Sequence, residues 1–190
     1  MKLGKTLYVA NRKEWRAWLR KHHSSAREIW LLYYKKESGK PRIPYNDAVE
    51  EALCYGWIDG QTKSVDAEKW AQRFSPRRPG GNWSAMNIER LRRLAARRKV
   101  TKAGFAAAPG GLRGVTRSAA PKPARIPPDI LRSLKRHPDA WKNFQKFPAS
   151  YKRIRIGWID ASRNRPDFFR KRLDYFIRMT AQNKRFGMVQ

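Results

Sequence analysis

Two groups of side chains in this sequence have the types and spacing that binding or catalytic chemistry would require. The first is a polar cluster in which three acidic residues stand close together in a strongly basic chain; it comprises Glu50, Glu51, Asp59 and Lys63. These carboxylates could act together on a ligand. They could equally form ion pairs with Lys63, Arg77 or Arg78 and serve only to stabilise the fold. The sequence leaves both interpretations open.

The second group lies in the stretch SPRRPGGNWSAMN, residues 75–87, and could bind an anion. It contains two arginines, a glycine pair that permits close backbone approach, a tryptophan, and a serine at which a helix is expected to begin. Guanidinium groups and the unpaired N–H groups of a helix N-terminus both suit phosphate. The candidate anion-binding residues are Arg77, Arg78, Trp83, Ser84 and Asn87. The alternative is a structural loop whose tryptophan packs into the core.

The other reactive residue types do not support a catalytic or metal site. The three histidines, His22, His23 and His137, lack ligand spacing with the single cysteine or with the acids. Cys54 stands beside Leu53 and is expected to be a small buried hydrophobic residue. The sequence contains no phosphate-binding glycine loop, dinucleotide-binding glycine pattern or hydrolase serine motif. We therefore expect no catalytic residue, no cofactor and no metal.

The charge balance is the strongest compositional signal. The 190 residues include 44 lysine and arginine residues against 15 acidic ones, a net charge of +29. Such a charge favours a polyanionic partner, nucleic acid above all, although an arginine-rich composition without functional meaning would give the same number. Helix-turn-helix, RNP and zinc-finger signatures are absent from the sequence. A protein partner or a small anionic ligand therefore stays open as well.

The sequence gives no indication of export or membrane insertion. Its first residues, MKLGKTLYVANRKEW, are basic but lack the apolar core and cleavage site of a signal peptide. No apolar run approaches the roughly 18 residues that a membrane span needs. We expect a cytoplasmic protein.

Composition divides the chain into three parts. Residues 106–128 are rich in alanine, glycine, proline and arginine and contain no aromatic residue, which predicts a solvated linker. Residues 1–105 mix strand and helix patterns and are expected to form a small α+β domain. Residues 129–190 show only helical periodicity and are expected to form an all-helical module.

Several elements of the first domain can be predicted from periodicity. Short strands are expected at TLYVA and EIWLLYYKK, a helix between them at RKEWRAWLRKHH, and two strands around a turn at Asp66–Ala67. A helix capped by Asn46 is expected to carry Trp57 on its apolar stripe and to end at Gly60. The helix that begins at Ser84 should face solvent with its basic residues Arg90, Arg93 and Arg97.

The tetrapeptide GWID occurs at residues 56–59 and again at 157–160. The first copy is expected to close a helix. The second is expected to lie inside a helix whose inward residues are Tyr151, Ile154, Trp158 and Ala161. In both copies the tryptophan falls on an apolar stripe, so we interpret both as core residues and the repeat as coincidence.

The run IPYNDAVEEALCYGWIDGQTKSVD, then RFSPRRPGGNWSAMNIERLRRL, and the C-terminal segment from IPPDILRSLKRH to RPDFFRKRLDYF resemble the YdeI/OmpD-associated family of bacterial proteins. The resemblance implies a helical C-terminal module and a link to protection against bacteriocins or cationic antimicrobial peptides. It implies no reaction and no catalytic residue. Where the family tends to have Thr-Arg before its last helix, this chain has Phe168–Phe169, so a polar role of that pair is not expected.

Three functions follow as hypotheses. The first is a non-enzymatic cytoplasmic protein that supports resistance to bacteriocins or cationic peptides. Because a protein of charge +29 repels cationic peptides, that effect would have to run through a partner or an anionic ligand. The second is nucleic-acid binding, and the third, less favoured, is an enzyme that acts on a small anionic substrate.

Limited proteolysis tests the predicted division of the chain. Residues 106–128 hold few large apolar side chains, so we expect a protease to cut there first and to leave two resistant fragments, identified by mass spectrometry. Cleavage within residues 45–60 at the same rate would contradict the predicted boundaries.

Overall fold

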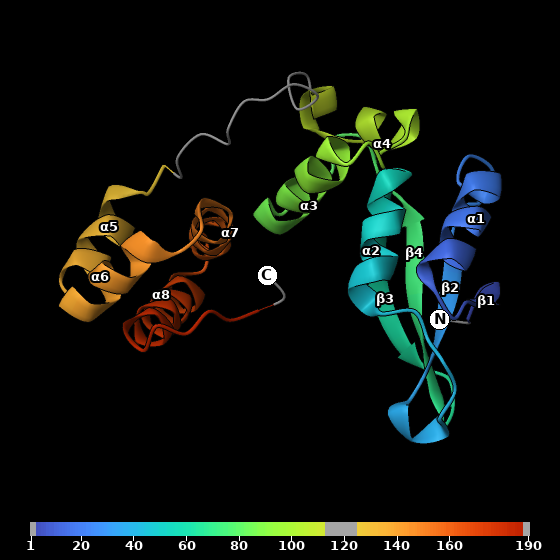
Figure 1. Ribbon diagram of the computed structural model, residues 1–190, viewed down its shortest axis with the longest axis horizontal. Helices are drawn as coiled ribbons and strands as arrows, with labels where there is room; N and C mark the ends of the chain where they lie inside the picture. The colour runs from blue at the N-terminus through green and yellow to red at the C-terminus, as the bar shows by residue number, and fades with distance from the viewer. Residues whose placement is uncertain (1–2, 113–124, 188–190) are drawn as a thin grey trace. The chain divides into compact units, whose positions relative to one another are not determined.

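A computed structural model describes residues 3–112 and 125–187 of the chain (Figure 1). The described residues form two compact units. The first unit holds residues 3–82 and 90–112, and the second holds residues 83–89 and 125–187.

The first unit is built on a mixed sheet of four strands in the order β1-β2-β4-β3. Strands β1 and β2 pair in parallel, and the other two pairs are antiparallel. Its elements are β1 (Thr6–Tyr8), α1 (Arg12–His22), β2 (Ile29–Tyr34), the 3-10 turn η1 (Lys36–Ser38), α2 (Tyr45–Cys54), β3 (Trp57–Ser64), β4 (Lys69–Pro76), α3 (Ala85–Ala96) from Arg90 onward, α4 (Lys102–Ala106) and η2 (Pro109–Leu112). The predicted α+β class is confirmed.

Helices α1 and α2 lie side by side on one face of this sheet (Figure 1). Their apolar stripes reach the strands: Trp15 of α1 is fully buried, and its ring lies 5.4 Å from that of Phe74 on β4. The Trp15 indole N–H also donates to the Ala48 carbonyl of α2 at 3.0 Å. The core of the unit therefore sits between the two helices and the sheet.

The strand pair β3–β4 turns where the sequence predicts. The Asp66 carboxylate accepts hydrogen bonds from the backbone N–H groups of Glu68 and Lys69, at 2.9 and 3.0 Å. An aspartate side chain that bonds its own backbone in this way fixes a tight turn. The predicted turn at Asp66–Ala67 is thus confirmed.

The predicted helix from Asn46 to Gly60 is wrong at both ends. Helix α2 ends at Cys54, and Gly56 takes a positive φ of 76°, which redirects the chain into β3 at Trp57. A side chain at Gly56 would also collide with the Ala103 carbonyl, 2.8 Å from the position of a Cβ. At the other end the cap position is Pro44, and the Asn46 amide oxygen instead accepts from Arg90 at 2.6 Å.

The α3 helix begins beside Ser84 as predicted, but its outward face is not what the sequence suggests. Arg90 was expected to face solvent and is only 7% exposed. It is buried because its guanidinium group reaches Asn46 on α2. Arg93 and Arg97 are exposed, in agreement with the prediction.

Every regular element among the described residues of the second unit is a helix, which confirms the predicted class. Besides the first residues of α3 it contains α5 (Pro128–Lys135), α6 (Pro138–Lys146), α7 (Ala149–Asp160) and α8 (Pro166–Ala181). Apolar residues of all four helices form one core, among them Ile130, Phe144, Tyr151, Ile159 and Phe176. The buried apolar residues of α7 do not follow one helical spacing, because Ile156 and Ile159 are buried as well as Tyr151 and Ile154.

The inward face predicted for α7 is therefore only partly right. Trp158 is half-buried and packs against the edge of the core, and Ala161 is exposed. The helix is buried on more than one side, so a single apolar stripe does not describe it. The second GWID copy does lie inside a helix, whereas the first begins a strand, which leaves the two copies structurally unrelated.

The predicted linker falls mostly on residues 113–124, which lie outside the described residues, so its boundaries stay predictions. Its first residues include the end of α4 and the turn η2. In the part of the chain that the structure describes, no helix combines the length and apolar character needed to cross a membrane.

Replacement of Trp57 tests its core role. Trp57 is 1% exposed, and its indole N–H donates to the His23 carbonyl at 3.0 Å. We expect Trp57→Ala to lower the free energy of unfolding by about 3–5 kcal/mol, measured by urea titration. Val65→Ala, at a 37% exposed position of the same unit, is the control and should change little. Unfolding of W57A at the parental urea concentration would show that Trp57 is not a core residue.

Candidate functional site

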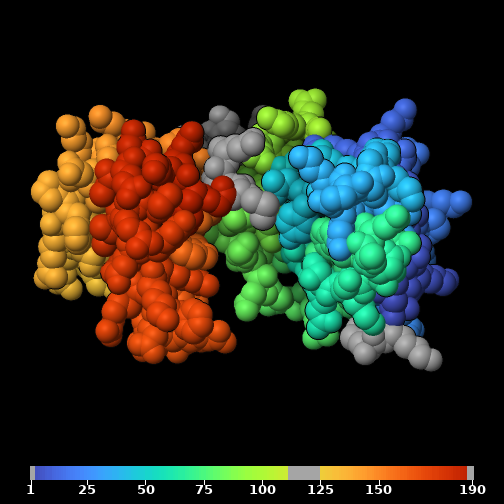
Figure 2. All heavy atoms as spheres, turned by 90° about the horizontal axis from the view of Figure 1, so that it is seen from below, coloured from blue at the N-terminus to red at the C-terminus, as the bar shows by residue number. Residues whose placement is uncertain are grey.

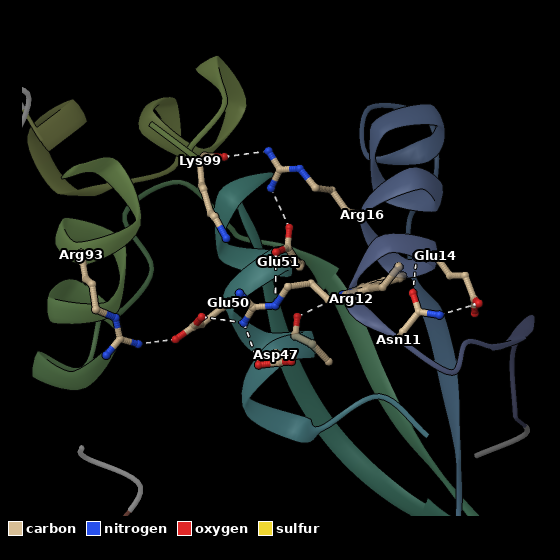
Figure 3. A network of polar contacts seen from close by, with 11 residues as sticks. Asn11, Arg12, Glu14, Arg16, Asp47, Glu50, Glu51, Arg93 and Lys99 are labelled. Carbon is tan, nitrogen blue, oxygen red and sulfur yellow. Dashed lines mark hydrogen bonds and ion pairs between the residues drawn. The ribbon is translucent and has the colours of Figure 1, made fainter. Parts of the chain in front are cut away.

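The acidic residues of α2 belong to a network of polar contacts in the first unit (Figure 3). Arg12 of α1 stands at its centre. One guanidinium nitrogen of Arg12 lies 2.7 Å from both Asp47 and Glu50, and another lies 3.5 Å from Glu51. Arg12 therefore binds three carboxylates that follow one another along one side of α2.

Two further arginines complete this network. Arg16, one turn after Arg12 on α1, contacts Glu51 at 2.6 Å and donates to the Lys99 carbonyl at 2.9 Å. Arg93 reaches Glu50 from α3 (Figure 3). The network thus connects α2 to α1 on one side and to α3 and the segment after it on the other.

The electrostatics of the network hold the Glu50 carboxylate in the charged form. Burial by itself would raise the pKa of Glu50, but the hydrogen bond from Arg12 and the charges of Arg12 and Arg93 outweigh it and lower that pKa below its usual value. A glutamate that stays ionised and bound to two arginines is a poor proton donor or acceptor at neutral pH. Glu50 and Glu51 therefore act as structural ion pairs in this arrangement.

Asp59 has different surroundings from the α2 glutamates. Its carboxylate accepts a hydrogen bond from the hydroxyl of Tyr45, at the first turn of α2. Burial, followed by the bond to Asp59, raises the pKa of Tyr45 well above its usual value. The hydroxyl of Tyr33 on β2 is buried close to this pair and has no hydrogen-bond partner among the described residues. Lys63 is exposed further along β3.

The fold also places Arg77, one of the predicted anion-binding residues, near Asp59. Its backbone N–H donates to the Gly56 carbonyl at 2.9 Å, and its guanidinium group donates to the Asn82 carbonyl at 3.2 Å. Burial lowers the pKa of Arg77 to about 10, and the negative charge of Asp59 opposes that shift. Arg77 therefore braces the loop that follows β4, whereas the neighbouring Arg78 is exposed.

The other predicted anion-binding residues belong to the second unit. Ser84 begins α3, because its hydroxyl accepts a hydrogen bond from the Asn87 backbone N–H at 3.2 Å. Trp83 is half-buried. Arg77 and Arg78 are in the first unit, so the set of five residues stays a prediction as a single anion site.

Sequence reasoning missed the residues that organise the polar cluster, namely Tyr45, Arg12, Arg16 and Arg93. The signal was present in part: Arg12 and Arg16 are four residues apart on one helix face, and the acids of α2 have matching spacing. Cys54 is fully buried, and burial raises the pKa of its thiol to about 11. The expected core role of Cys54 agrees with both observations.

Two family models match the chain in separate regions. Residues 7–107, more than half of the 190 residues, match a domain of unknown function (DUF8412). Residues 123–183 match the family described as bacteriocin-protection, YdeI or OmpD-associated. The resemblance to this family is confirmed there, while the N-terminal motif block lies within the first match. No curated protein and no solved structure matches the chain.

Replacing Glu50 by glutamine tests the structural role of the network. The Glu50 side chain is 12% exposed, but its partner Arg93 is 46% exposed. We therefore expect a loss of about 2–3 kcal/mol in the free energy of unfolding at pH 7, below the range for fully buried pairs. Glu37→Gln, which removes the same charge at an exposed position, is the control and should have little effect.

The pH dependence of this difference provides a second measurement. Because the folded-state pKa of Glu50 is depressed, its stabilising contribution is complete above the unfolded-state pKa and is lost as pH falls through the folded-state pKa. The stability difference between parent and E50Q should therefore shrink below about pH 4. A difference that is constant down to pH 3 would contradict the assigned ion pairs.

Proposed function

The chain belongs to the DUF8412 family and also carries a domain of the bacteriocin-protection, YdeI or OmpD-associated family; from this premise we propose that it is a non-enzymatic nucleic-acid-binding protein that contributes to protection against bacteriocins or cationic antimicrobial peptides. A partner of opposite charge is required because direct capture of a cationic peptide would be repelled.

The charge distribution carries the proposal. The described residues of the first unit include 23 basic against 9 acidic ones, and those of the second include 17 against 6. Several of the acids are ion-paired, as Glu50, Glu51, Glu28 and Asp129 are. Surplus basic charge is consequently left at the surface of both units, where it attracts phosphate groups through release of their counterions.

The C-terminal part of α3 and the start of α4 show this surplus clearly. Residues 90–102 contain seven basic residues and no acidic one. Arg97, Arg98 and Lys102 are exposed there. A helix C-terminus concentrates partial negative charge, so basic side chains at the end of α3 are also favourable for the helix itself. Their number exceeds what one helix end needs, which favours a polyanion as the second role.

The salt dependence of binding tests the proposal. We expect duplex DNA, followed by fluorescence anisotropy, to bind at low salt and to weaken steeply as salt rises, because each neutralised phosphate contributes about 0.9 to the slope of log K against log salt. Failure to bind at low salt, or an affinity that salt does not change, would overturn the proposal.

Two double variants with equal charge loss then separate diffuse from local binding. Arg77→Gln with Arg78→Gln alters the loop after β4, and Arg97→Gln with Lys102→Gln alters the surface at α3 and α4. We expect each pair to lower the slope by at most about 1.8, two phosphate contacts. A much larger affinity loss in R77Q/R78Q alone would instead identify that loop as a specific anion site. Melting temperatures of both variants separate these losses from unfolding, since Arg77 braces its loop.

A survival assay connects binding to protection. A susceptible bacterium that expresses the parent chain should survive a cationic peptide better than one that expresses the double variants, provided that all accumulate to the same level. Equal survival with a variant that no longer binds DNA would separate protection from nucleic-acid binding.

A further inference from the structure

We propose that the N-terminal end of α8 is a binding surface for single-stranded nucleic acid, on which Phe168 stacks against a base. The inference rests on the proposed function and makes its ligand more specific. It concerns a surface of the second unit that is separate from the polar cluster of the first.

Phe168 is the starting observation. The residue is 54% exposed, more than any other large apolar residue among those that the structure describes. It belongs to the first turn of α8, a helix that lies at the surface of the second unit (red in Figure 2). Phe169, the next residue, is half-buried and packs against the helical core. The two adjacent residues therefore differ in role: Phe169 holds the helix against the core, and Phe168 remains accessible to a ligand.

Basic side chains flank the exposed ring along the same helix face. Phe168 and Lys171 are three residues apart on α8 and so lie on one side of it, and Arg165 stands at the cap position three residues before Phe168. The Arg165 guanidinium carbon lies 5.8 Å from the centre of the Phe168 ring. Arg165 and Lys171 are both exposed. The row thus alternates a cation, an aromatic ring and a cation.

The local charge is strongly positive around this row. Residues 161–173 contain five basic residues and a single acid, Asp167. The N-terminus of α8 adds the positive end of a helix dipole, and Arg165 at the cap position makes no side-chain cap bond there. A phosphate group would therefore be attracted to the same place as a base that stacks on Phe168.

A cavity lies close to the row at the start of α8. It has a volume of about 270 Å³ and is lined by Arg163, Pro166, Phe169, Arg170 and Leu173. Its wall is apolar at Phe169 and Leu173, while Arg170 is exposed at its edge. Arg163 lies over the Phe169 ring at 5.0 Å and is held there by Asp129 at 2.9 Å. The cavity therefore adds two arginines and a partly apolar wall to the surface at the start of α8.

Aromatic rings interleaved with cations favour single strands over other anionic partners. Unpaired bases stack on aromatic side chains while the phosphates lie against basic residues, and this mode needs no base sequence. Bases inside a duplex are already stacked on one another, so they cannot use Phe168 in this way. The surface should therefore discriminate by strandedness.

Three substitutions at Phe168 test the inference, with a thymidine oligonucleotide of about 12 residues as the single-stranded probe. We expect Phe168→Ala and Phe168→Leu each to weaken binding of this probe about tenfold, and Phe168→Trp to restore it, because stacking needs an aromatic face. The salt dependence should be unchanged in all three, since no phosphate contact is removed. Affinity for a duplex of the same length should also be unchanged.

Two control variants complete the experiment. Arg165→Gln should lower the salt slope for the single strand by about 0.7, one phosphate contact. Tyr8→Ala removes an aromatic residue that is 40% exposed in the first unit, and it should leave the affinity for both probes unaltered.

Two results would overturn the inference. If F168A binds the single strand as tightly as the parent, no base stacks on Phe168. If F168L keeps full affinity, the contact is merely apolar, and an acidic peptide or a lipid chain fits the surface better. Either result leaves the proposed function intact as long as the parent chain binds nucleic acid with a steep salt dependence. Absence of that binding in the parent would overturn both proposals.

Discussion

The buried carboxylates of α2 are the constraint on which the first unit depends. The Glu51 side chain is 1% exposed and that of Glu50 is 12% exposed. An unpaired carboxylate in such surroundings would destabilise the fold by several kcal/mol. The partners come from other elements, Arg12 and Arg16 from α1 and Arg93 from α3. The requirement for ion pairs therefore fixes how these helices are placed around α2.

The same requirement shapes the surface. In a chain with 44 basic and 15 acidic residues, each acid that forms an ion pair neutralises one cation, and the excess of basic residues stays unneutralised. Glu28 with Arg73, Glu89 with Arg153, and Asp129 with Arg163 repeat the pattern outside the α2 network. Internal ion pairing is thus one consequence of this composition, and the polyanion binding that we propose would be a second.

Aromatic residues offset cationic charge in the second unit. Arg155 is 4% exposed, and its guanidinium carbon lies 4.7 Å from the Phe186 ring centre and 5.7 Å from that of Trp158. Burial lowers the pKa of Arg155, and the electron-rich ring faces partly replace the water that it loses. Phe168 with Arg165 shows the same pairing in an exposed form. Cation and ring pairing is therefore a recurrent means of accommodating arginine in this unit.

Local sequence determined those features that depend on neighbours along the chain. Most strand and helix periods, the turn at Asp66, the start of α3 at Ser84 and the basic surplus could be predicted in this way. The sequence also predicted the burial of Trp57, although it placed Trp57 on a helix and the structure places it at the start of strand β3. A helical stripe and a strand that begins after a turn bury the same tryptophan, so burial alone does not distinguish them.

Only the tertiary structure decided which distant groups meet. The end of α2 at Cys54 depends on the positive φ of Gly56 and on the approach of the Ala103 carbonyl, and α4 lies far along the chain from that turn. The acids of α2 form ion pairs with Arg12, Arg16 and Arg93 because α1 and α3 pack beside them. The sequence shows the types of charged residues and their spacing along the chain. The strength of an ion pair, however, depends on the distance between the two groups and on their burial. Both of these quantities are set by packing between elements that are remote in the sequence.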